Sequence, residues 1–528
     1  MQTAPTRVDP SVEETRRILV IFAGLLVAML LSSLDQLIFS TALPTIVGEL
    51  SGVEQMLWVT TAYVLAATIM MPVYGKLGDL IGRKYLFMGA LALFLAGSVL
   101  GGLAGSMPWL IAARAVQGLG GGGLMILSQA IVADVVPLRE RARYMGMIGA
   151  VFALSSVAGP LLGGWFTEGI GWRWAFWFNV PLGLLALLAA WRFLPHTRPS
   201  QRPRLDVWGF VTMAIAVTAL ILFTSLGGNT YAWASPPILG LGALALLAAV
   251  AFVMIEQRVA EPIIPLHLFR NRSFNLATIV AMTLAVAMFG AVAYFPTYLQ
   301  MVHGYNATVA GLLMVPMVMG AMVSTVTAGN LISKTGQYKG ILLACPAIAT
   351  IGLLLLSTLN VTTSIWMISL FLFIFGVGIG LGVQNLVLVV QSAFPAREVG
   401  TATAATNFFR EIGASLGAAV VGSFFTTRLV SLLAERFPDG ATTPVDVASL
   451  TPQVLRSLPD ALRLPIASAY NDALVPVFLL LIPMMLIGLV LLLFVEEIPL
   501  TGTLETDAAG SQTPDDSSRT SIEGLPAA

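Results

Sequence analysis

The sequence predicts an all-helical membrane protein of about fourteen transmembrane helices. Of its 528 residues, 57% are hydrophobic and only 10% are charged, and the mean hydropathy is +0.88. Apolar runs of about 20 residues, each long enough to cross a bilayer as a helix, follow one another along most of the chain. Two segments of the first half also return in the second half, which indicates two related bundles of helices.

The spans are separated by short polar segments rich in Gly, Pro and charged residues. Their approximate limits are 18–43, 55–75, 85–104, 108–133, 143–167, 173–193, 207–226, 236–255, 274–300, 308–331, 340–359, 363–394, 400–425 and 474–495.

An even number of spans places both termini on one side of the membrane. With that side in the cytoplasm, most of the 27 Lys and Arg residues lie in inward segments, as the positive-inside rule requires. The predicted parts are a cytoplasmic N-terminus 1–17, a first bundle 18–193, a two-helix insert 194–273, a second bundle 274–495 with a partly helical outer loop 426–473, and a disordered cytoplasmic tail 496–528.

The internal repeat preserves glycines and loses charges. The repeated stretches are "GKLGDLIGRK" (75–84) with "GNLISKTGQY" (329–338), the glycines of 118–122 with those of 376–380, and the Pro-x-Arg-Glu of 137–140 with that of 395–398. Ser333 stands where the first copy has Asp79, and Gln337 where it has Arg83. Chance among 50 glycines is the alternative. Secondary transporters are built from such repeats, with two halves that rock around a central site.

Composition argues against several classes of function. The net charge is zero, so nothing indicates a nucleic-acid partner. With three His and one Cys there is no metal-ligand cluster, and we find neither a phosphate-binding loop nor a nucleophile with an evident base. We therefore expect no cofactor and no enzymatic activity. The lone Cys345 lies in an apolar run and is expected to pack as a small hydrophobe.

Five motifs resemble those of one transporter family. "GKLGDLIGRK" is similar to the signature between helices 2 and 3 of the major facilitator superfamily. The others are "LDQLIFSTALP" (34–44) in helix 1, "ARAVQGLGGG" (112–121) in helix 4, "SSVAGPLLGG" (155–164) in helix 5 and "NFFREIGASLG" (407–417) in helix 13. Ser155 replaces the usual Gly of the helix 5 motif. Together they resemble the fourteen-helix drug:proton antiporters over roughly residues 15–498.

The resemblance implies a fold and a helix 5 motif. In the major facilitator fold two six-helix bundles face each other, so 207–226 and 236–255 would be two extra helices inserted between the halves. The helix 5 motif, associated with antiport through the resemblance alone, comprises Gly159, Pro160, Gly163 and Gly164. Physically, these residues give a bendable helix with a smooth face for close packing.

The charged loop predicts a latch between the two bundles. Asp79 and Arg83 are four residues apart and can pair on a helical turn, and Asp134 ends the fourth span on the same side of the membrane. Gly75 and Gly82 allow a sharp turn and close helix approach. We expect Asp79 also to face the N-terminus of the helix beginning near Gly400, whose dipole favours an anion. The alternative is that the basic residues only fix topology.

Four charged residues lie well away from the ends of predicted spans, where charge is costly and a functional role is the default hypothesis. Asp35 and Arg114 lie at similar depths, roughly 13 and 9 Å from the outer ends of their helices. We expect Asp35 to carry the coupling proton, with Arg114 as its partner. Arg410 and Glu411, near the middle of their span, are further candidates for proton coupling. The alternatives are a hydrogen-bonded structural carboxylate at Asp35 and a local ion pair or packing device at Arg410 and Glu411.

The substrate cavity is expected to be mostly apolar, because flexible Met and aromatic side chains adapt to varied ligands. Packing or lipid contact is the alternative for each of its candidate residues, which are Gln117, Met288, Phe289, Tyr294, Met314 and Asn407.

The predicted function is proton-coupled efflux of amphipathic drug-like molecules across a bacterial cytoplasmic membrane. The expected partners are a proton, a small amphipathic substrate and the lipid bilayer, with the protein a monomer. Alternatives are a dedicated exporter of an endogenous lipid or secondary metabolite, a substrate-specific importer, and a scaffold or sensor that does not transport. Buried charge argues against the scaffold.

Overall fold

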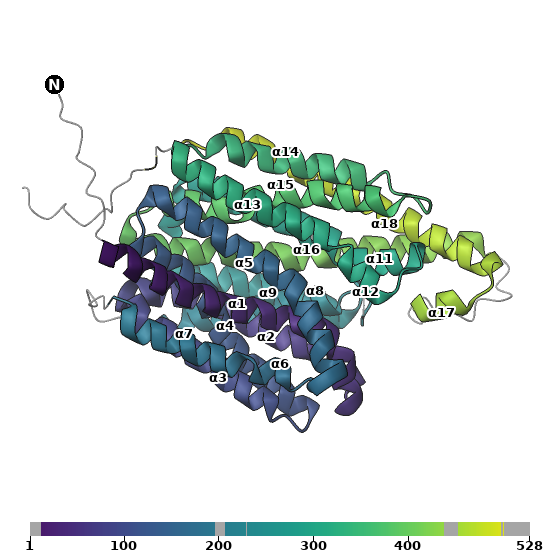
Figure 1. The fold of residues 1–528 in the computed structure, drawn as a ribbon, viewed down its shortest axis with the longest axis horizontal. Coiled ribbons are helices and arrows are strands. Elements are labelled where there is room, and N and C mark those ends of the chain that lie inside the picture. The colour runs from purple at the N-terminus through teal and green to yellow at the C-terminus, as the bar shows by residue number, and fades with distance from the viewer. Residues whose placement is uncertain (1–11, 196–205, 229, 438–451, 498–499, 501–528) are drawn as a thin grey trace, which may run out of the picture.

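The structure is a computed structural model, which describes residues 12–195, 206–228, 230–437, 452–497 and 500 (Figure 1). Within this part of the chain, 14 helices are long and apolar enough to cross a membrane. Hydrogen bonding within each helix satisfies its own backbone, which a spanning segment in lipid requires. The predicted all-helical membrane class is confirmed.

The first bundle supplies six spans. It begins with a helix of 38 residues that extends beyond the hydrocarbon thickness. Its sixth span is broken between Trp177 and Asn179, where two helices meet. The helices are α1 (Val12–Glu49), α2 (Met56–Ile81), α3 (Arg83–Gly102), α4 (Met107–Val135), α5 (Leu138–Trp165), α6 (Trp174–Trp177) and α7 (Asn179–Phe193), with the short turns η1 (Val53–Gln55) and η2 (Phe166–Ile170).

The second bundle repeats this order. Its first two spans are broken near Tyr294 and Leu313, each followed by a Pro at the start of the next helix. The helices are α10 (Arg272–Val292), α11 (Phe295–Val302), α12 (Ala307–Leu312), α13 (Val315–Thr335), α14 (Lys339–Leu356), α15 (Ile365–Ser392), α16 (Val399–Arg436), α17 (Pro452–Ser457) and α18 (Asp460–Leu493), with the short turns η3 (Leu266–Arg270) and η4 (Ala396–Glu398).

Two equivalent glycines support the repeat. Gly82, between α2 and α3, has φ 91°, and Gly336, between α13 and α14, has φ 75°. Glycine adopts a positive φ without strain, so both copies need a glycine here, although ψ is 149° at Gly82 and 0° at Gly336. The two copies therefore share the position of the glycine but neither its full backbone conformation nor the charges around it.

The inserted helices α8 (Val207–Leu226) and α9 (Pro236–Glu256) pack against each other. α8 also packs against α2 and α16, one helix from each bundle. Thr224 of α8 and Ser415 of α16 are hydrogen-bonded at 2.7 Å, and Lys76 of α2 forms an ion pair with Glu261 at 2.6 Å. The insert is therefore attached to both bundles.

The helices α16 and α18 are longer than predicted. Their expected limits were 400–425 and 474–495, whereas α16 ends at Arg436 and α18 begins at Asp460. Arg428 donates to the backbone oxygen of Asp472 at 2.9 Å, and Arg436 forms an ion pair with the Asp472 carboxylate. These contacts stabilise the two helices beyond their apolar parts, so much of the predicted loop 426–473 is helix. Residues 438–451 lie outside the described residues.

The first residues of the predicted tail are ordered. Glu497 accepts from the backbone N–H of Tyr338 at 2.9 Å and of Lys339 at 3.3 Å, at the start of α14. A carboxylate is favoured there because it satisfies free N–H groups and meets the positive end of the helix dipole. Disorder was therefore wrong for Glu496 and Glu497, and residues 498–499 and 501–528 lie outside the described residues, as do residues 1–11.

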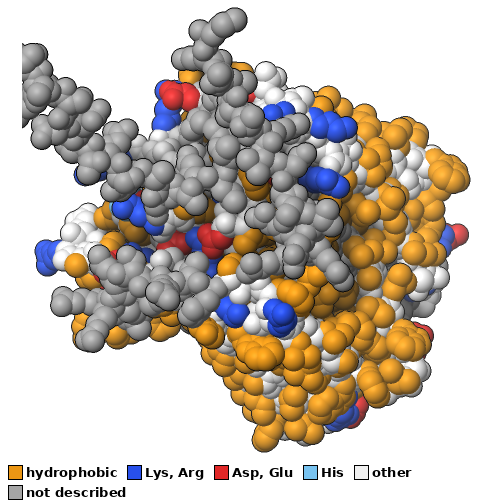
Figure 2. Space-filling model, turned by 60° about the vertical axis from the view of Figure 1, so that its left-hand side comes forward, with side chains coloured by type: hydrophobic (Ala, Val, Ile, Leu, Met, Phe, Trp, Pro, Cys, Tyr) orange, Lys and Arg blue, Asp and Glu red, His pale blue; other side chains and the backbone are white. Residues whose placement is uncertain are grey.

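The two bundles contact each other mainly through α2 with α16 and α5 with α13, and α4 and α15 also meet helices of the opposite bundle. Figure 1 shows the bundles side by side, with the described N-terminal end of α1 at the left. Figure 2 shows Lys and Arg gathered around that end and hydrophobic side chains over the flanks. This distribution is typical of a membrane protein with one strongly basic face.

Candidate functional site

A buried ionic network occupies the interior of the first bundle. Asp35 is 0% exposed, and Arg114 is 1% exposed. Arg114 donates to Asp35 Oδ2, while Gln117 Nε2 and Asn179 Nδ2 donate to Asp35 Oδ1 at 2.7 and 3.1 Å. Gln117 and Asn179 also reach Ser98 Oγ at 2.8 and 3.2 Å. The network joins α1, α3, α4 and α7.

Aromatic rings enclose the Arg114 guanidinium. Its central carbon lies 4.3 Å from the centre of the Phe39 ring and 4.4 Å from that of Tyr63. Gly97 of α3 allows α4 to approach here, because an added Cβ would lie 2.5 Å from the Gln117 backbone. A charge in such a site depends on its ionic partner, so a change in the protonation of Asp35 would disturb four helices together.

The predicted pair of Asp35 and Arg114 is thus brought together, and Gln117, expected in a substrate cavity, is hydrogen-bonded within this network. Ser98 and Asn179 were missed by sequence reasoning, although each is a polar residue within or beside an apolar span. The hydrogen bonds described for Asp35 all come from the first bundle.

The residues expected to form the latch lie together at one end of the molecule. Arg83 donates to Asp79 Oδ1 at 2.6 Å and also to Asp134. Asp79 Oδ2 in turn accepts from the backbone N–H of Thr401 at 2.6 Å and from its hydroxyl at 2.8 Å, and the Gly400 N–H lies 3.2 Å from Oδ1. A carboxylate of the first bundle therefore caps α16 of the second.

Glycine makes this capping possible. An added Cβ at Gly75 would lie 2.8 Å from the Gly400 backbone oxygen and would also meet the Ala404 side chain. The α2 backbone can therefore approach the start of α16 only without a side chain at this position.

Arg139 forms a second contact between the bundles at the same end. It lies at the start of α5 and donates through Nε to the backbone oxygen of Ser333 at 2.9 Å, and also to that of Lys334. These carbonyls are at the C-terminus of α13, where the helix dipole favours a cation. Asp79 thus binds the N-terminus of α16, and Arg139 binds the C-terminus of α13. We call the end of the molecule where both residues lie the latch end. Sequence reasoning noted Arg139 in the repeat but gave it no role.

An amide cluster lies between the bundles, further from the latch end. Asn407 Nδ2 donates to Gln129 Oε1 at 3.0 Å, and Gln129 Nε2 donates to Gln384 Oε1 at 3.3 Å. Gln391 Nε2 lies 3.4 Å from the Gln129 backbone oxygen and 3.3 Å from the Thr403 hydroxyl. All five residues are buried. Asn407, expected in a substrate cavity, is therefore part of a closed contact between the bundles.

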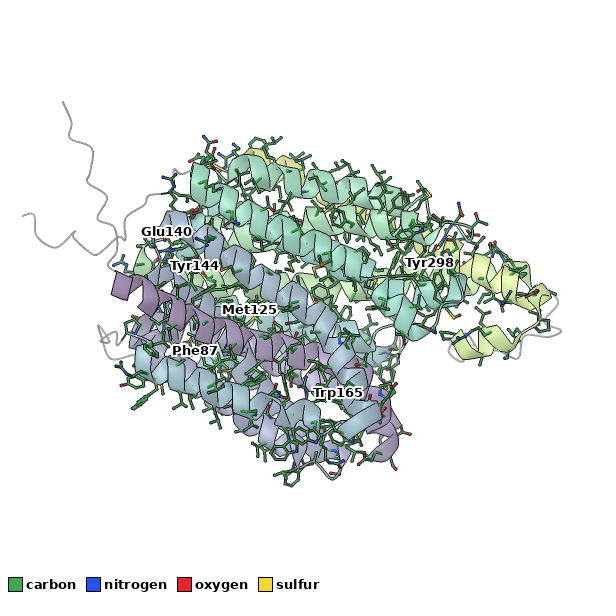
Figure 3. All side chains as sticks on the ribbon, viewed as in Figure 1. Phe87, Met125, Glu140, Tyr144, Trp165 and Tyr298 are labelled. Atoms are coloured by element: carbon green, nitrogen blue, oxygen red, sulfur yellow. The ribbon has the colours of Figure 1, made fainter. Side chains whose placement is uncertain are left out.

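Arg410 and Glu411 lie about one helical turn beyond Asn407. Arg410 Nη2 is 3.7 Å from Glu411 Oε1 and 3.7 Å from the sulfur of Met125 on α4. Met125 lies in the middle of the molecule in Figure 3. In the described part of the chain, Arg410 and Glu411 make no contact with the Asp35 network.

The helix 5 motif packs against α1 through two of its glycines. At Gly159, an added Cβ would lie 2.6 Å from the Leu37 Cβ, and at Gly163 it would lie 2.6 Å from the Ile38 backbone oxygen. At Gly164 it would meet nothing within 4 Å. Close packing was therefore wrong for Gly164. The Pro160 carbonyl lies 3.5 Å from the Thr41 hydroxyl, a weak contact with α1.

The four remaining cavity candidates lie in the second bundle. Met288, Tyr294 and Met314 are partly buried against its hydrophobic core, and the Tyr294 ring packs on Phe425 with centres 5.3 Å apart. Phe289 is 39% exposed. The ring contact of Tyr294 with Phe425 of α16 agrees with the packing interpretation for this residue.

Comparison with known proteins agrees with this geometry. The family model for the Major Facilitator Superfamily matches residues 25–418. The chain is 40% identical to the uncharacterized MFS-type transporter Rv1877 of Mycobacterium tuberculosis, over 94% of this chain and 73% of that protein. It is 35% identical to the multidrug transporter protein MdtP of Bacillus subtilis, over 88% of each.

More distant relatives and a solved structure complete the comparison. The efflux pump FUS6 of Gibberella fujikuroi is 30% identical over 98% of this chain and 96% of that protein. The structure of the proton:xylose symporter XylE matches with a TM-score of 0.59 at 14% identity, over 92% of this chain and 97% of that one, which shows the fold alone. The chain belongs to the Major Facilitator Superfamily, and it is a membrane transporter, not an enzyme.

Proposed function

We propose that the protein exports amphipathic small molecules from a bacterial cytoplasm in exchange for protons, as a monomer with both termini inside. Alternating access would proceed by rocking of the two bundles about their interface. The observation that carries the proposal is the fully buried pair of Asp35 and Arg114. Placing a charged pair at this depth costs free energy, so such a pair is expected to serve a function. Relatives named as multidrug transporters support the class of substrate.

Protonation of Asp35 would couple to rocking through the first bundle. A neutral Asp35 no longer forms an ion pair with Arg114, and Arg114 then lacks a counter-ion between two aromatic rings. The relation between α1 and α4 would change in response, and both helices belong to the moving bundle. Coupling would thus act through the conformation of the bundle, because a substrate between the bundles does not reach the 0% exposed Asp35.

The energy available from protons is sufficient for export. One charge moved inward across 100 mV contributes about 2.3 kcal/mol, and a tenfold proton gradient adds about 1.4 kcal/mol. Their sum would sustain a substrate gradient of several hundredfold for one proton per neutral molecule.

The test is efflux from proteoliposomes of an Asp35→Asn variant. Asn keeps the size and one acceptor oxygen but cannot carry a proton, so uphill efflux that a protonophore abolishes should be lost. Downhill exchange of the same transported compound should remain, which would show that the variant folds. Uphill pumping by Asp35→Asn under an imposed pH gradient would contradict the proposal.

Glu49 offers a matched control on the same helix. It lies beyond the apolar part of α1 and accepts from Arg173 and Trp172 at 2.6 Å each, and the hydrogen bond from Arg173 holds the pKa of Glu49 below its usual value. Glu49→Gln also removes an acidic group paired with arginine, yet it should leave uphill efflux intact. Equal loss in both variants would mean that any break in the bundle stops transport.

Export of one endogenous metabolite is the second candidate. It is favoured by relatives such as the fungal efflux pump FUS6 and a transporter of the acurin A biosynthesis cluster. Deletion of the gene distinguishes the two candidates. If the protein is a dedicated exporter, its loss should leave one compound accumulated inside the cell and should not change resistance to unrelated drugs.

A further inference from the structure

In the described part of the chain, three arginines have their guanidinium groups inside the bundles, and two of them are well coordinated. Arg83 has two carboxylates, those of Asp79 and Asp134, and two backbone oxygens within reach. Arg114 has Asp35, Gln117, a backbone oxygen and two aromatic rings. Each therefore compensates for its loss of water with partners from the chain itself.

Arg410 lacks such compensation. Its side chain is only 13% exposed, and a guanidinium carries five N–H donors. The partners described for it are the Glu411 carboxylate at 3.7 Å, which is beyond hydrogen-bond distance, and the Met125 thioether, a weak acceptor. Most of its donors therefore have no acceptor from the described part of the protein.

The position of Arg410 points to a ligand between the bundles. The residue belongs to α16 of the second bundle, and its contact Met125 belongs to α4 of the first. The amide cluster that includes Asn407 and Gln129 lies one helical turn nearer the latch end, so the interface below Arg410 is closed. Arg410 thus lies between the two bundles, on the side of the amide cluster that faces away from the latch end.

We infer that Arg410 binds an anionic oxygen group of the transported molecule, such as a carboxylate. The inference rests on the proposed function and narrows its substrate class to amphipathic molecules that carry such a group, zwitterions included. A planar guanidinium accepts a carboxylate with two parallel hydrogen bonds. The loose Glu411 contact is the one that the substrate replaces, because a carboxylate hydrogen-bonded to the guanidinium interacts with it more strongly than one held at 3.7 Å.

A matched pair of dyes tests the inference with the full-length protein in detergent. A rhodamine with a free benzoate and the ethyl ester of the same rhodamine differ only in the group that Arg410 would bind. Fluorescence polarisation gives the Kd of each dye for the wild type and for Arg410→Gln. Arg410→Gln should weaken binding of the benzoate about ten- to a hundredfold, which is the strength of a hydrogen bond to a charged group. Its Kd for the ester should change about threefold or less. Arg410→Lys should recover part of the benzoate affinity, because it retains the charge.

Other results would overturn the inference. If both dyes lose affinity equally, Arg410 supports the fold and not the ligand, and if neither does, water alone satisfies the guanidinium. Arg397→Gln is the matched control, since this arginine is 81% exposed, and it should change neither Kd. Binding in detergent requires no proton gradient, so a failure here is distinguishable from a failure of proton coupling, which the Asp35→Asn assay reports.

Discussion

Replacement of Asp79 with Asn should open the latch end. The carboxylate accepts three hydrogen bonds from α16, two from the backbone of Gly400 and Thr401 and one from the Thr401 hydroxyl. Bonds to a charged acceptor contribute about 1 kcal/mol more than bonds to a neutral one. The loss of charge should therefore weaken closure by about 3 kcal/mol, which shifts the equilibrium between closed and open forms roughly a hundredfold.

The shift can be measured as a distance between the bundles. Gly89 of α3 and Gly340 of α14 are exposed, and a Cβ added at either meets nothing within 4 Å, so both accept a cysteine for spin labels. The native Cys345 is buried and need not be replaced. Pulsed electron resonance should show Asp79→Asn with a larger population at long distance than the wild type.

Two controls separate a latch from a general loss of stability. Ser333→Ala changes the residue that replaces Asp79 in the second copy, where Arg139 contacts only the backbone oxygen, so its distance distribution should match the wild type. Asp134→Asn weakens the contact of Arg83 with residue 134 inside the first bundle, and it should give a smaller shift of the distance distribution than Asp79→Asn. The latch is refuted if Asp79→Asn lowers the melting temperature without any change in the distance distribution.

Two further predictions concern packing and buried polar contacts. Gly163→Ala should lower the melting temperature by the equivalent of about 1–3 kcal/mol, because the new methyl group meets the Ile38 backbone, whereas Gly164→Ala should be neutral; equal effects in a thermal unfolding assay would contradict the described α1–α5 contact. Gln129→Leu removes the hydrogen bonds of Gln129 to Asn407 and Gln384. Asn407 keeps its bond to the Thr403 backbone oxygen, but Gln384 Oε1 loses its partner, at about 1–3 kcal/mol in the closed form, and the distance distribution should shift toward the open form. Ser128→Ala is its control, since the Ser128 hydroxyl has no hydrogen-bond partner, and an equal shift in both variants would be the contrary outcome.

Hydropathy predicts where the chain crosses the membrane, but not where its helices end. The spans were found because about 20 apolar residues have few alternatives to a membrane helix. The ends of α16 and α18 were missed because they are stabilised by polar contacts such as Arg436 with Asp472, which a hydropathy window does not record. The breaks near Tyr294 and Leu313 were also missed, because they occur within continuous apolar runs, where hydropathy shows no interruption.

The site was predictable where one partner indicates the other. The spacing of Asp79 and Arg83 predicts their pairing, and a helix start near Gly400 predicts a place for the carboxylate. Arg139 gave no such signal, because it contacts backbone oxygens, which every residue has. The amide cluster was equally hidden, since Gln129 and Asn407 come from separate bundles and lack charge. The family resemblance was confirmed, whereas the roles of the site residues stay predictions.

The inserted pair of helices makes the flanks of the transporter unequal toward lipid. α8 covers the line where α2 meets α16, and α9 lies outside it with most of its side chains exposed. On the opposite flank, α5 and α13 meet without a covering helix in the described residues. Lateral exchange with the bilayer would therefore differ between flanks: hydrocarbon chains would reach the dividing line at α5 and α13 directly, and two further helices would screen them from it on the other side.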